Sequence, residues 1–391
     1  MLVLRSPILQ MTIILAAVVV DLLGYGLVVP LLPAVLDELL PAATQDAALI
    51  GLILAGYALL QAIGGPLLGA LSDRIGRRPV LLLCLFGTSI GYTLLALATN
   101  VWMLVLALLV DAATGANLSV AQAAIADRSS ATTRARNFGL VGVAFGLGVT
   151  LGPFLAGVLV PFGLRTPAMA AALLAWLNLV AAWVLLPETH PADQRQAALA
   201  FQPKHEALLP SGLWPVLAIM TLMNLAFVGL QSNFPLYSTR QFGWDVAQVA
   251  FFFGMVGVFA VFTQALLINL LRRFLSEQPL ACLGAVMMAV GLLLFSLAPA
   301  GWMLYPTAVV AAIGSSLCIP TLTSLLSQRA GTLSQGRAMA AQQVAINIAL
   351  VAGPLLAGVS AQWIAPQAPY LLGMACAWAS AILLLRLRAE A

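Results

Sequence analysis

Charged residues are scarce in this chain. Lysine, arginine, aspartate and glutamate together make up 8% of its 391 residues, whereas 62% of the residues are hydrophobic. A soluble globular domain carries about 25% charged residues, which its water-facing surface requires. The composition therefore excludes a soluble globular protein and predicts a membrane protein that crosses the bilayer several times.

Histidine and cysteine are also rare, with two and four residues. The histidines, His190 and His205, lie in a polar stretch that should be solvated, and no spacing typical of metal ligands involves the cysteines. All four cysteines fall inside apolar runs, where packing is their ordinary role: Cys84, Cys282, Cys318 and Cys376. We therefore expect no metal site, no cofactor and no disulfide framework.

Long apolar runs, by contrast, are abundant. Twelve of them are long enough to cross a bilayer, which takes about 20 residues as a helix. The first run is too long for a signal peptide and carries an acid, so we expect it to remain in the mature protein. The sequence predicts an all-α protein with twelve transmembrane helices over residues 8–36, 46–71, 79–98, 101–127, 137–161, 167–186, 212–237, 245–271, 279–298, 302–327, 337–363 and 368–386.

The basic residues predict how the chain is oriented. All but two of the 17 Lys and Arg residues lie in alternate connections or near the chain ends, the exceptions being Arg165 and Arg240. By the positive-inside rule both termini are then cytoplasmic, and the expected location is a bacterial inner membrane. The net charge of +4 reflects this asymmetry and gives no indication of nucleic-acid binding.

The chain divides into two similar halves. One long polar connection, residues 187–211, separates six predicted spans in 1–186 from six in 212–391. Gly152-Pro153-x-x-Ala156-Gly157 recurs as Gly353-Pro354-x-x-Ala357-Gly358, about 200 residues later, as a parallel duplication requires. We expect two pseudo-symmetric bundles of six helices, one on each side of a cytoplasmic linker.

A charged motif joins the second and third predicted spans. Four charges fall within residues 73–78, in the sequence Gly69-Ala-Leu-Ser-Asp-Arg-Ile-Gly-Arg-Arg-Pro79. Such a cluster cannot lie in hydrocarbon, so it predicts a short aqueous loop. A generic positive loop would explain the arginines but not the acid and the two glycines at this spacing. The motif resembles the signature loop of major facilitator superfamily transporters, and the resemblance implies a gate built from Gly69, Asp73, Arg74, Gly76, Arg77 and Arg78.

Two acids, Asp21 and Asp111, lie well inside predicted spans. An ionised acid at the centre of a membrane costs about 2.5–3.5 kcal/mol on insertion scales, so such residues are functional by default. Burial favours the protonated form, which makes reversible protonation accessible. Both acids are predicted proton-coupling residues, although a structural role in bonding between helices is the alternative.

Other polar side chains form stripes at helical spacing. These faces could line one central cavity, or some of the side chains could merely bond between helices. The predicted substrate-binding residues are Tyr25, Tyr57, Gln61, Gln122, Asn224, Gln231, Gln343 and Asn347.

The fifth predicted span is rich in glycine. Small residues let a neighbouring helix approach backbone to backbone, and a Gly-Pro step permits a bend. Ordinary tight packing is the alternative reading. The predicted helix-bend residues are Gly148, Gly152, Pro153 and Gly157.

Spans one to five together resemble the twelve-span drug/proton antiporters, and the tetracycline exporters in particular. The resemblance rests on Asp21-x-x-Gly24-x-Gly26-x-x-x-Pro30-x-x-Pro33, Tyr57-Ala-Leu-Leu-Gln61, the motif at 69–79, Trp102-Met-Leu, Thr114-Gly115, Ile125-Ala-Asp127 and Phe145-Gly-Leu-Gly148 with Gly152-Pro153. It is strong over the first ~160 residues. It implies proton-driven export, with Asp21 and Gln61 in a central cavity and Asp73, Arg77 and Asp127 in a cytoplasmic gate network.

The chain departs from that family at three places. The tetracycline exporters have an acid where this chain has Gly91 and another in span nine, where this chain has none. An arginine common in these antiporters aligns with Leu108, and Asp111 follows three residues later. The departures argue against tetracycline itself as the substrate.

The sequence thus predicts a monomeric transporter, not an enzyme, with small molecules, protons and the lipid bilayer as its partners. The predicted function is a proton-coupled antiporter that exports small amphipathic or apolar compounds by alternating access. The alternatives are an uptake carrier for a nutrient and a non-transporting receptor. When the cytoplasmic side is shut, Asp73 is expected to hold the amino end of span eleven near Arg337, and Arg77 to pair with Asp127.

Overall fold

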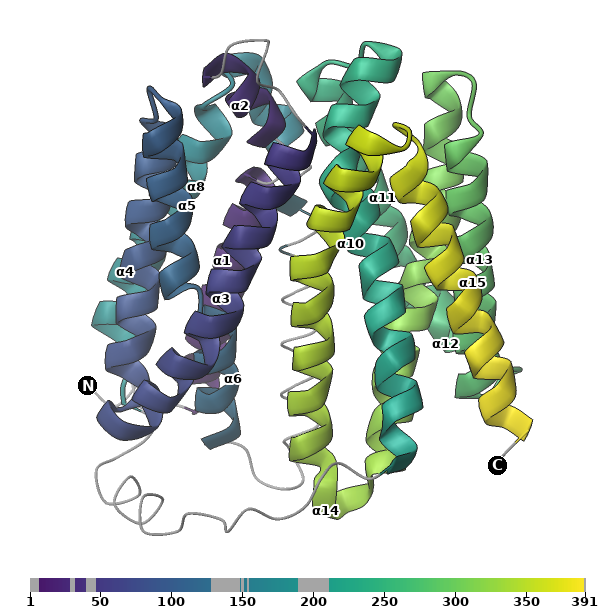
Figure 1. Cartoon of the computed structure of the whole chain (residues 1–391). Helices are drawn as coiled ribbons and strands as arrows, with labels where there is room; N and C mark the ends of the chain where they lie inside the picture. The colour runs from purple at the N-terminus through teal and green to yellow at the C-terminus, as the bar shows by residue number, and fades with distance from the viewer. Residues whose placement is uncertain are drawn as a thin grey trace. The chain divides into compact units, whose positions relative to one another are not determined.

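The computed structural model describes residues 7–28, 32–39, 47–127, 148, 151–152, 155–188 and 211–389. These residues form helices and short connections, and no strand occurs among them (Figure 1). The helices are α1 (Pro7–Val28), α2 (Leu32–Leu39), α3 (Ala47–Ile75), α4 (Arg77–Ala96), α5 (Val101–Thr114), α6 (Asn117–Asp127), α8 (Thr166–Leu185), α10 (Trp214–Phe242), α11 (Val246–Phe262), a π-helical turn (Thr263–Leu267), α12 (Ile268–Leu271), α13 (Glu277–Ser296), α14 (Leu304–Trp363) and α15 (Ala368–Ala389). Short 3-10 turns cover Val160–Phe162, Ser211–Leu213 and Gly301–Met303.

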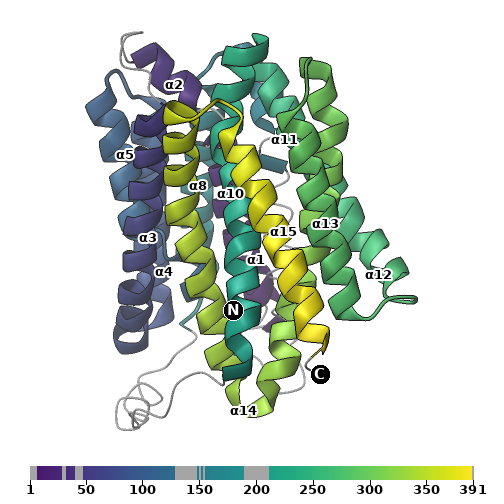
Figure 2. The ribbon, with the colours of Figure 1, turned by 45° about the vertical axis from the view of Figure 1, so that its right-hand side comes forward.

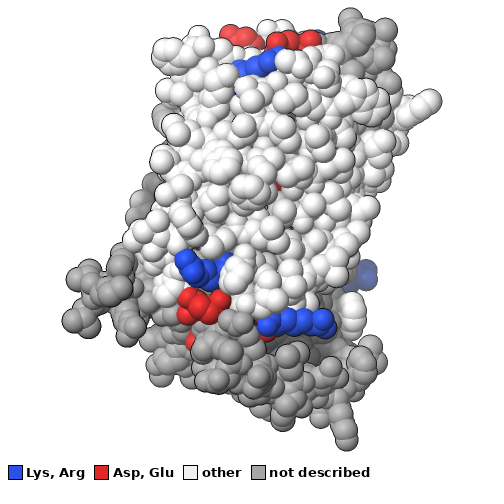
Figure 3. Space-filling view, turned by 90° about the vertical axis from the view of Figure 1, so that its left-hand side faces the viewer, with Lys and Arg blue, Asp and Glu red and all other residues white. Residues whose placement is uncertain are grey.

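Ten segments in the described part of the chain are long and apolar enough to cross a membrane. A shorter apolar segment, Met11–Gly24, lies within α1. On the face drawn in Figure 3, the charged side chains gather in two bands near opposite ends, with a broad uncharged surface between them. The protein is therefore a multi-pass membrane protein. The count of twelve spans stays a prediction, since the span expected at 137–161 lies largely outside the described residues.

Five of the seven exposed tryptophans among the described residues lie near the ends of helices, whereas Trp176 and Trp378 lie midway along α8 and α15. Such amphipathic rings prefer the boundary between hydrocarbon and headgroups, so the positions of these five agree with helices that end at a membrane surface. The five are Trp102, Trp183, Trp214, Trp302 and Trp363.

The helices group into two compact units. Unit 1 comprises residues 1–43 and 60–205. In it α4 packs against α5 and α8, while α1 packs against α6 and α8. The core between α1, α4 and α6 is aliphatic, with Ile14, Leu81 and Ile125 fully buried.

Unit 2 comprises residues 44–59 and 206–391. In it α14 packs against α10 and α13, and α15 packs against the same two helices (Figure 2). Its core is aromatic at one level: Phe234 stacks on Phe252 with ring centroids 3.7 Å apart, and Tyr370 lies against Phe295 at 4.6 Å.

The predicted span at 101–127 is interrupted in the structure. α5 ends at Thr114 and α6 begins at Asn117, with Gly115 and Ala116 outside both helices. The Ala116 N–H donates to the Thr114 carbonyl at 2.8 Å, so the regular i to i−4 pattern is lost there. The sequence reading had predicted one uninterrupted helix.

The opposite difference occurs in unit 2. The spans expected at 302–327 and 337–363 belong to one continuous helix, α14, and no loop separates them. The intervening residues 328–336 include no proline, but they hold two glycines, a serine and a threonine beside glutamine, arginine, alanine and leucine, so propensity alone does not explain the continuity. Polar composition alone therefore did not end the helix.

Candidate functional site

The junction of α3 and α4 is a turn of one residue, Gly76. Its φ of 111° lies where side-chain-bearing residues are strained, so glycine is required there. The Gly76 N–H donates to the carbonyl of Ser72 at 3.1 Å. This turn places Arg77 at the first position of α4, close to the last turn of α3.

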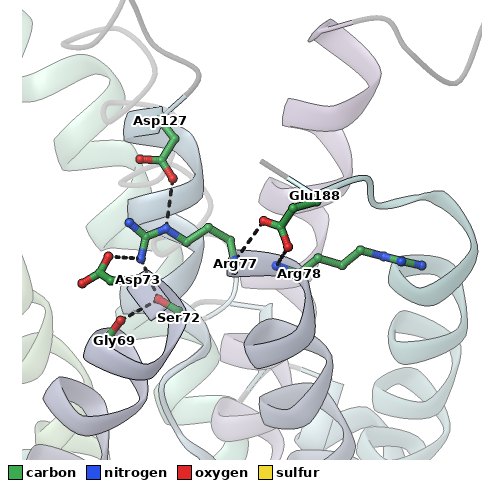
Figure 4. Close-up of polar contacts among 7 residues, drawn as sticks. All are labelled: Gly69, Ser72, Asp73, Arg77, Arg78, Asp127 and Glu188. Carbon is green, nitrogen blue, oxygen red and sulfur yellow. Dashed lines mark hydrogen bonds and ion pairs between the residues drawn. The ribbon is translucent and has the colours of Figure 1, made fainter. Parts of the chain in front are cut away.

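Arg77 is the centre of an ion-pair cluster that joins three parts of unit 1 (Figure 4). Its Nε donates to Asp127 Oδ2 at 2.9 Å, and its Nη1 lies 2.6 Å from Asp73 Oδ1. Nη1 also donates to Ser72 Oγ at 2.6 Å, and Ser72 in turn donates to the Gly69 carbonyl. The Arg77 side chain is only 10% exposed, so these contacts replace the water it gives up. The expected pairing of Arg77 with Asp127 is present.

Glu188, which falls in the predicted linker, also belongs to this cluster. Its carboxylate accepts the backbone N–H groups of Arg77 at 2.9 Å and of Arg78 at 3.3 Å. These are the first two amides of α4, which have no partner inside the helix, so Glu188 caps the helix and complements its dipole. Arg78 also donates to the Trp183 carbonyl at 2.6 Å, and Arg74 is exposed. No sequence signal identifies Glu188, because its partners are backbone amides about 110 positions away.

A second polar cluster lies in the apolar part of unit 1. Asn117, at the start of α6, donates its amide to Asp21 Oδ1 on α1 at 2.6 Å and to Thr88 Oγ1 on α4 at 3.2 Å. Asn117 and Thr88 are each only 2% exposed. The amide oxygen of Asn117 has no hydrogen-bond partner among the residues that the structure describes. The sequence reading did not select Asn117 or Thr88.

Asp111 lies near this cluster and is buried on α5. It packs on Gly91 of α4, where an added Cβ would lie 2.8 Å from that of Asp111. Asp111 and Asp21 are close enough to interact electrostatically. The structure therefore brings together the two acids predicted for proton coupling.

The polar cluster surrounds the interruption between α5 and α6. Gln61 of α3 lies directly against Gly115, since a Cβ there would be 2.6 Å from Gln61 Nε2. Irregular backbone at membrane depth occurs where it is buried in protein or lines a cavity, and broken helices mark substrate and ion sites in many transporters. Asp21, Gln61, Asp111 and Asn117 thus gather at one such break.

Two glycines of the predicted bend lie against α1, just beyond Asp21. A Cβ on Gly152 would meet the Cα of Gly26 at 2.6 Å, and one on Gly148 would meet the Cβ of Leu22 at 2.5 Å. The backbones of the two segments are therefore in direct contact at Gly152. Gly157 is helical, and Pro153 lies outside the described residues.

For two of the remaining predicted site residues, the structure shows a hydrogen bond within their own helix. Asn224 donates to the Met220 carbonyl of its own helix at 2.8 Å, and Gln343 donates to Asn347 within α14 at 3.1 Å. Tyr57, Gln122 and Gln231 are partly buried. The side chains of Tyr25 and Arg337 lie outside the described part of the structure.

The protein is helical and membrane-embedded. It has buried acids beside a broken helix and an ion-pair cluster at a tight turn between helices, and these are features of a membrane carrier. The model of the Major Facilitator Superfamily matches residues 14–354. The chain belongs to this superfamily and is a transporter, not an enzyme.

Its similar proteins include bacterial resistance proteins. The chain is 33% identical to the tetracycline resistance protein, class C, of Escherichia coli over 348 residues, covering 88% of this chain and 87% of that one. It is 34% identical to the class D protein of Salmonella ordonez over 358 residues, with the same shares covered. Among solved structures, the human organic anion transporter MFSD10 (TETRAN) matches with a TM-score of 0.74 at 23% identity, over 97% of this chain and 100% of that one. The predicted resemblance to tetracycline exporters is confirmed.

Proposed function

We propose that this protein is a proton-coupled antiporter that exports small amphipathic or apolar compounds. The observation that carries the proposal is the cluster of Asp21, Asn117 and Asp111 at the break between α5 and α6. The Asp21 carboxylate accepts a hydrogen bond from a neutral amide and has no basic partner among the described residues, so it can change its protonation state without breaking an ion pair there.

The comparisons support the direction of transport. Similar proteins that span most of this chain are named tetracycline resistance proteins, and resistance proteins of a transporter family act by export. The identity of the substrate is not fixed by this likeness. The tetracycline exporters have an acid at the position of Gly91 and another in the ninth predicted span, and this chain lacks both. We therefore propose drug-like export and not tetracycline itself.

The energetics are sufficient for such a carrier. At a membrane potential of ~150 mV, one proton that enters the cell supplies about 3.5 kcal/mol. That free energy sustains a gradient of a neutral substrate of a few hundred-fold. To use it, Asp21 takes a proton from outside, and it releases the proton inside in step with substrate export. Asp111 tunes this exchange through its charge.

The proposed gate is the Arg77 cluster, which would lie at the cytoplasmic surface. The cluster would stabilise the state that is closed to the cytoplasm, with Asp73 additionally holding the amino end of the eleventh span near Arg337. The proposed architecture is two pseudo-symmetric six-helix halves, 1–186 and 212–391, in a monomer with both termini in the cytoplasm. Gln61 and the other predicted polar side chains would contact substrate in a central cavity.

The alternative is an uptake carrier for a small metabolite. The fold is shared with the human organic anion transporter, and a likeness at this identity does not distinguish uptake from export. The polar cluster would serve either direction.

Inside-out vesicles with a pH-sensitive dye separate these readings. After the vesicle interior has been acidified, an exported compound should release protons from it, and the dye should report that release. A growth-protection screen supplies the compounds, and vesicles without the protein give the baseline. Proton release with none of the protective compounds would contradict the antiport proposal, and substrate movement in the opposite sense would favour uptake.

A further inference from the structure

The short helix α6 has a polar contact at each end. Its first residue, Asn117, bonds Asp21 at 2.6 Å, and its last residue, Asp127, bonds Arg77 at 2.9 Å. The ten residue steps between them span about 15 Å of helix. One rigid element therefore connects the buried acid to the ion-pair cluster at the junction of α3 and α4 (Figures 1 and 4).

α6 is well suited to move as a body. Its apolar face, formed by Val120, Ala121, Ala124 and Ile125, is buried against α1 and α4, so a slide or tilt along these helices would expose no polar backbone. At its amino end the hydrogen-bond ladder to α5 is interrupted at Gly115 and Ala116. A break of this kind lets one half of a span shift without carrying the other half with it.

Asn117 responds to the protonation state of Asp21. With Asp21 ionised, the amide N–H group donates a charge-assisted hydrogen bond, which is stronger than a neutral one. A protonated Asp21 instead presents an O–H that needs an acceptor. The amide oxygen of Asn117 is buried and has no partner in the described part of the chain, so rotation of the amide would provide that acceptor at the expense of the present contacts.

No other described group around Asp21 offers the same link. The titratable side chains that face it are Asp111 on α5, and Tyr92 and Cys84 on α4; Tyr92 donates to the Asp21 backbone carbonyl at 3.4 Å. Asn178 of α8 is a second buried amide that contacts α1. It donates to the Ala17 carbonyl at 3.3 Å, and this contact does not involve α6.

We propose that α6 is the coupling element of the transporter: Asn117 senses whether Asp21 is ionised, and Asp127 passes the resulting shift of α6 to Arg77. Asn117 is thus a positioning residue that acts through Asp21. The inference rests on the proposed function only in taking Asp21 as the group that is protonated. Neutralising Asp21 should weaken the hold on α6 and loosen the Arg77 cluster.

Hydrogen–deuterium exchange of the peptide that covers residues 69–79 tests this in the purified full-length protein at pH 8, without substrate. Asp21→Asn imitates the protonated state. It should raise the exchange rate of that peptide by at least about fivefold, the lower end of ordinary coupling between sites. Asn117→Ala should remove the response, so that adding Asp21→Asn changes nothing further. The matched control Asn178→Ala should keep the full response.

A second variant covers the case in which Asn117→Ala does not fold. Asp127→Asn lies at the surface end of α6 and should likewise make exchange of residues 69–79 independent of Asp21→Asn. Unchanged or slower exchange in Asp21→Asn alone overturns the proposal, as does a full response in Asn117→Ala or in Asp127→Asn. Because the exchange assay requires no transport, a failure of proton-driven export in vesicles would contradict the proposed function separately.

Discussion

Units 1 and 2 both contain glycines at which two helices approach closely, but the residues that these glycines contact differ between the units. In unit 1, Gly91 of α4 packs on Asp111, and in unit 2, Gly291 of α13 packs on Ala311. Gly152 meets the Gly26 backbone in unit 1, whereas Gly353 meets the Val228 side chain in unit 2. Close helix packing is thus present in both units, while the buried acids are found in unit 1.

The difference extends to the backbone. The span that carries Asp111 is broken at Gly115, whereas α14 passes through Gly314 without interruption. The centre of unit 2 is filled by stacked aromatic rings such as Phe234 and Phe252, which favour rigidity. Among the described residues, the buried acids and the broken span thus lie in unit 1 and the stacked rings in unit 2, which supports the proposal that proton coupling resides in unit 1.

We expect the largest effect from a substitution in the polar cluster of unit 1, which has no counterpart among the described residues of unit 2. Asp21→Asn should abolish proton-driven accumulation, lowering a gradient of a few hundred-fold to one, because no group remains to carry the proton. Thr221→Ala in unit 2 should leave accumulation within about twofold, since that hydroxyl bonds its own helix and lies outside the predicted substrate-binding set. Substrate uptake into inside-out vesicles measures both, and equal losses in the two variants would contradict the specialisation.

Glycine substitutions give the next largest effect. Gly152→Leu should stop transport while the protein still inserts, because its side chain would collide with the Gly26 backbone, which cannot move aside. Gly152→Ala should destabilise unit 1 by about 1–3 kcal/mol. Gly353→Ala should cost less, since the Val228 side chain can adjust. Membrane yield, thermal unfolding and transport are compared across the three variants, and normal transport by Gly152→Leu would show that close approach is not needed.

The next effect is on stability alone, and it separates Arg77 at the start of α4 from Arg272, which directly follows α12. Arg77 is mostly buried with several partners, whereas Arg272 is 42% exposed and lies 3.6 Å from Glu277. Arg77→Gln should cost about 3–5 kcal/mol, because it leaves Asp127 without its ion pair. Arg272→Gln should cost no more than about 1 kcal/mol. Denaturation in detergent checks the order, and equal costs would mean that the Arg77 cluster contributes no more than a surface pair.

The smallest effect concerns Asp111. Asp111→Ala should fold normally, because Ala311 makes the corresponding contact in unit 2. It should weaken proton coupling and change the pH profile of transport without abolishing it, since Asp21 remains. The substrate gradient is measured as a function of external pH. A profile identical to that of the unaltered protein would assign Asp111 a structural role.

The sequence predicted those features that depend on local pattern. Length and hydropathy predicted the all-helical membrane class, and the spacing of Asp73, Gly76 and Arg77 predicted a tight charged turn. The contact of Arg77 with Asp127 followed from a family resemblance and is present. These inferences need only neighbouring residues or a known motif.

Features that depend on distant contacts were not predicted. Asn117 resembles any amide in an apolar run until α1 places Asp21 beside it, 96 positions away in sequence. Glu188 seemed part of a polar linker because its partners are backbone amides, which carry no sequence signal. The break at Gly115 and the continuity of α14 depend on packing and hydrogen bonding along the whole helix, which outweigh local propensity.

The central claim is that Asp21 in unit 1 couples proton entry to export, and proteoliposomes with an imposed pH gradient test it most directly. With a substrate from the protection screen, the unaltered protein should build a substrate gradient that follows the pH gradient. Asp21→Asn should still exchange labelled for unlabelled substrate but build no gradient, while the surface control Glu38→Gln should behave like the unaltered protein. Gradient-driven accumulation by Asp21→Asn at the normal level would contradict the account.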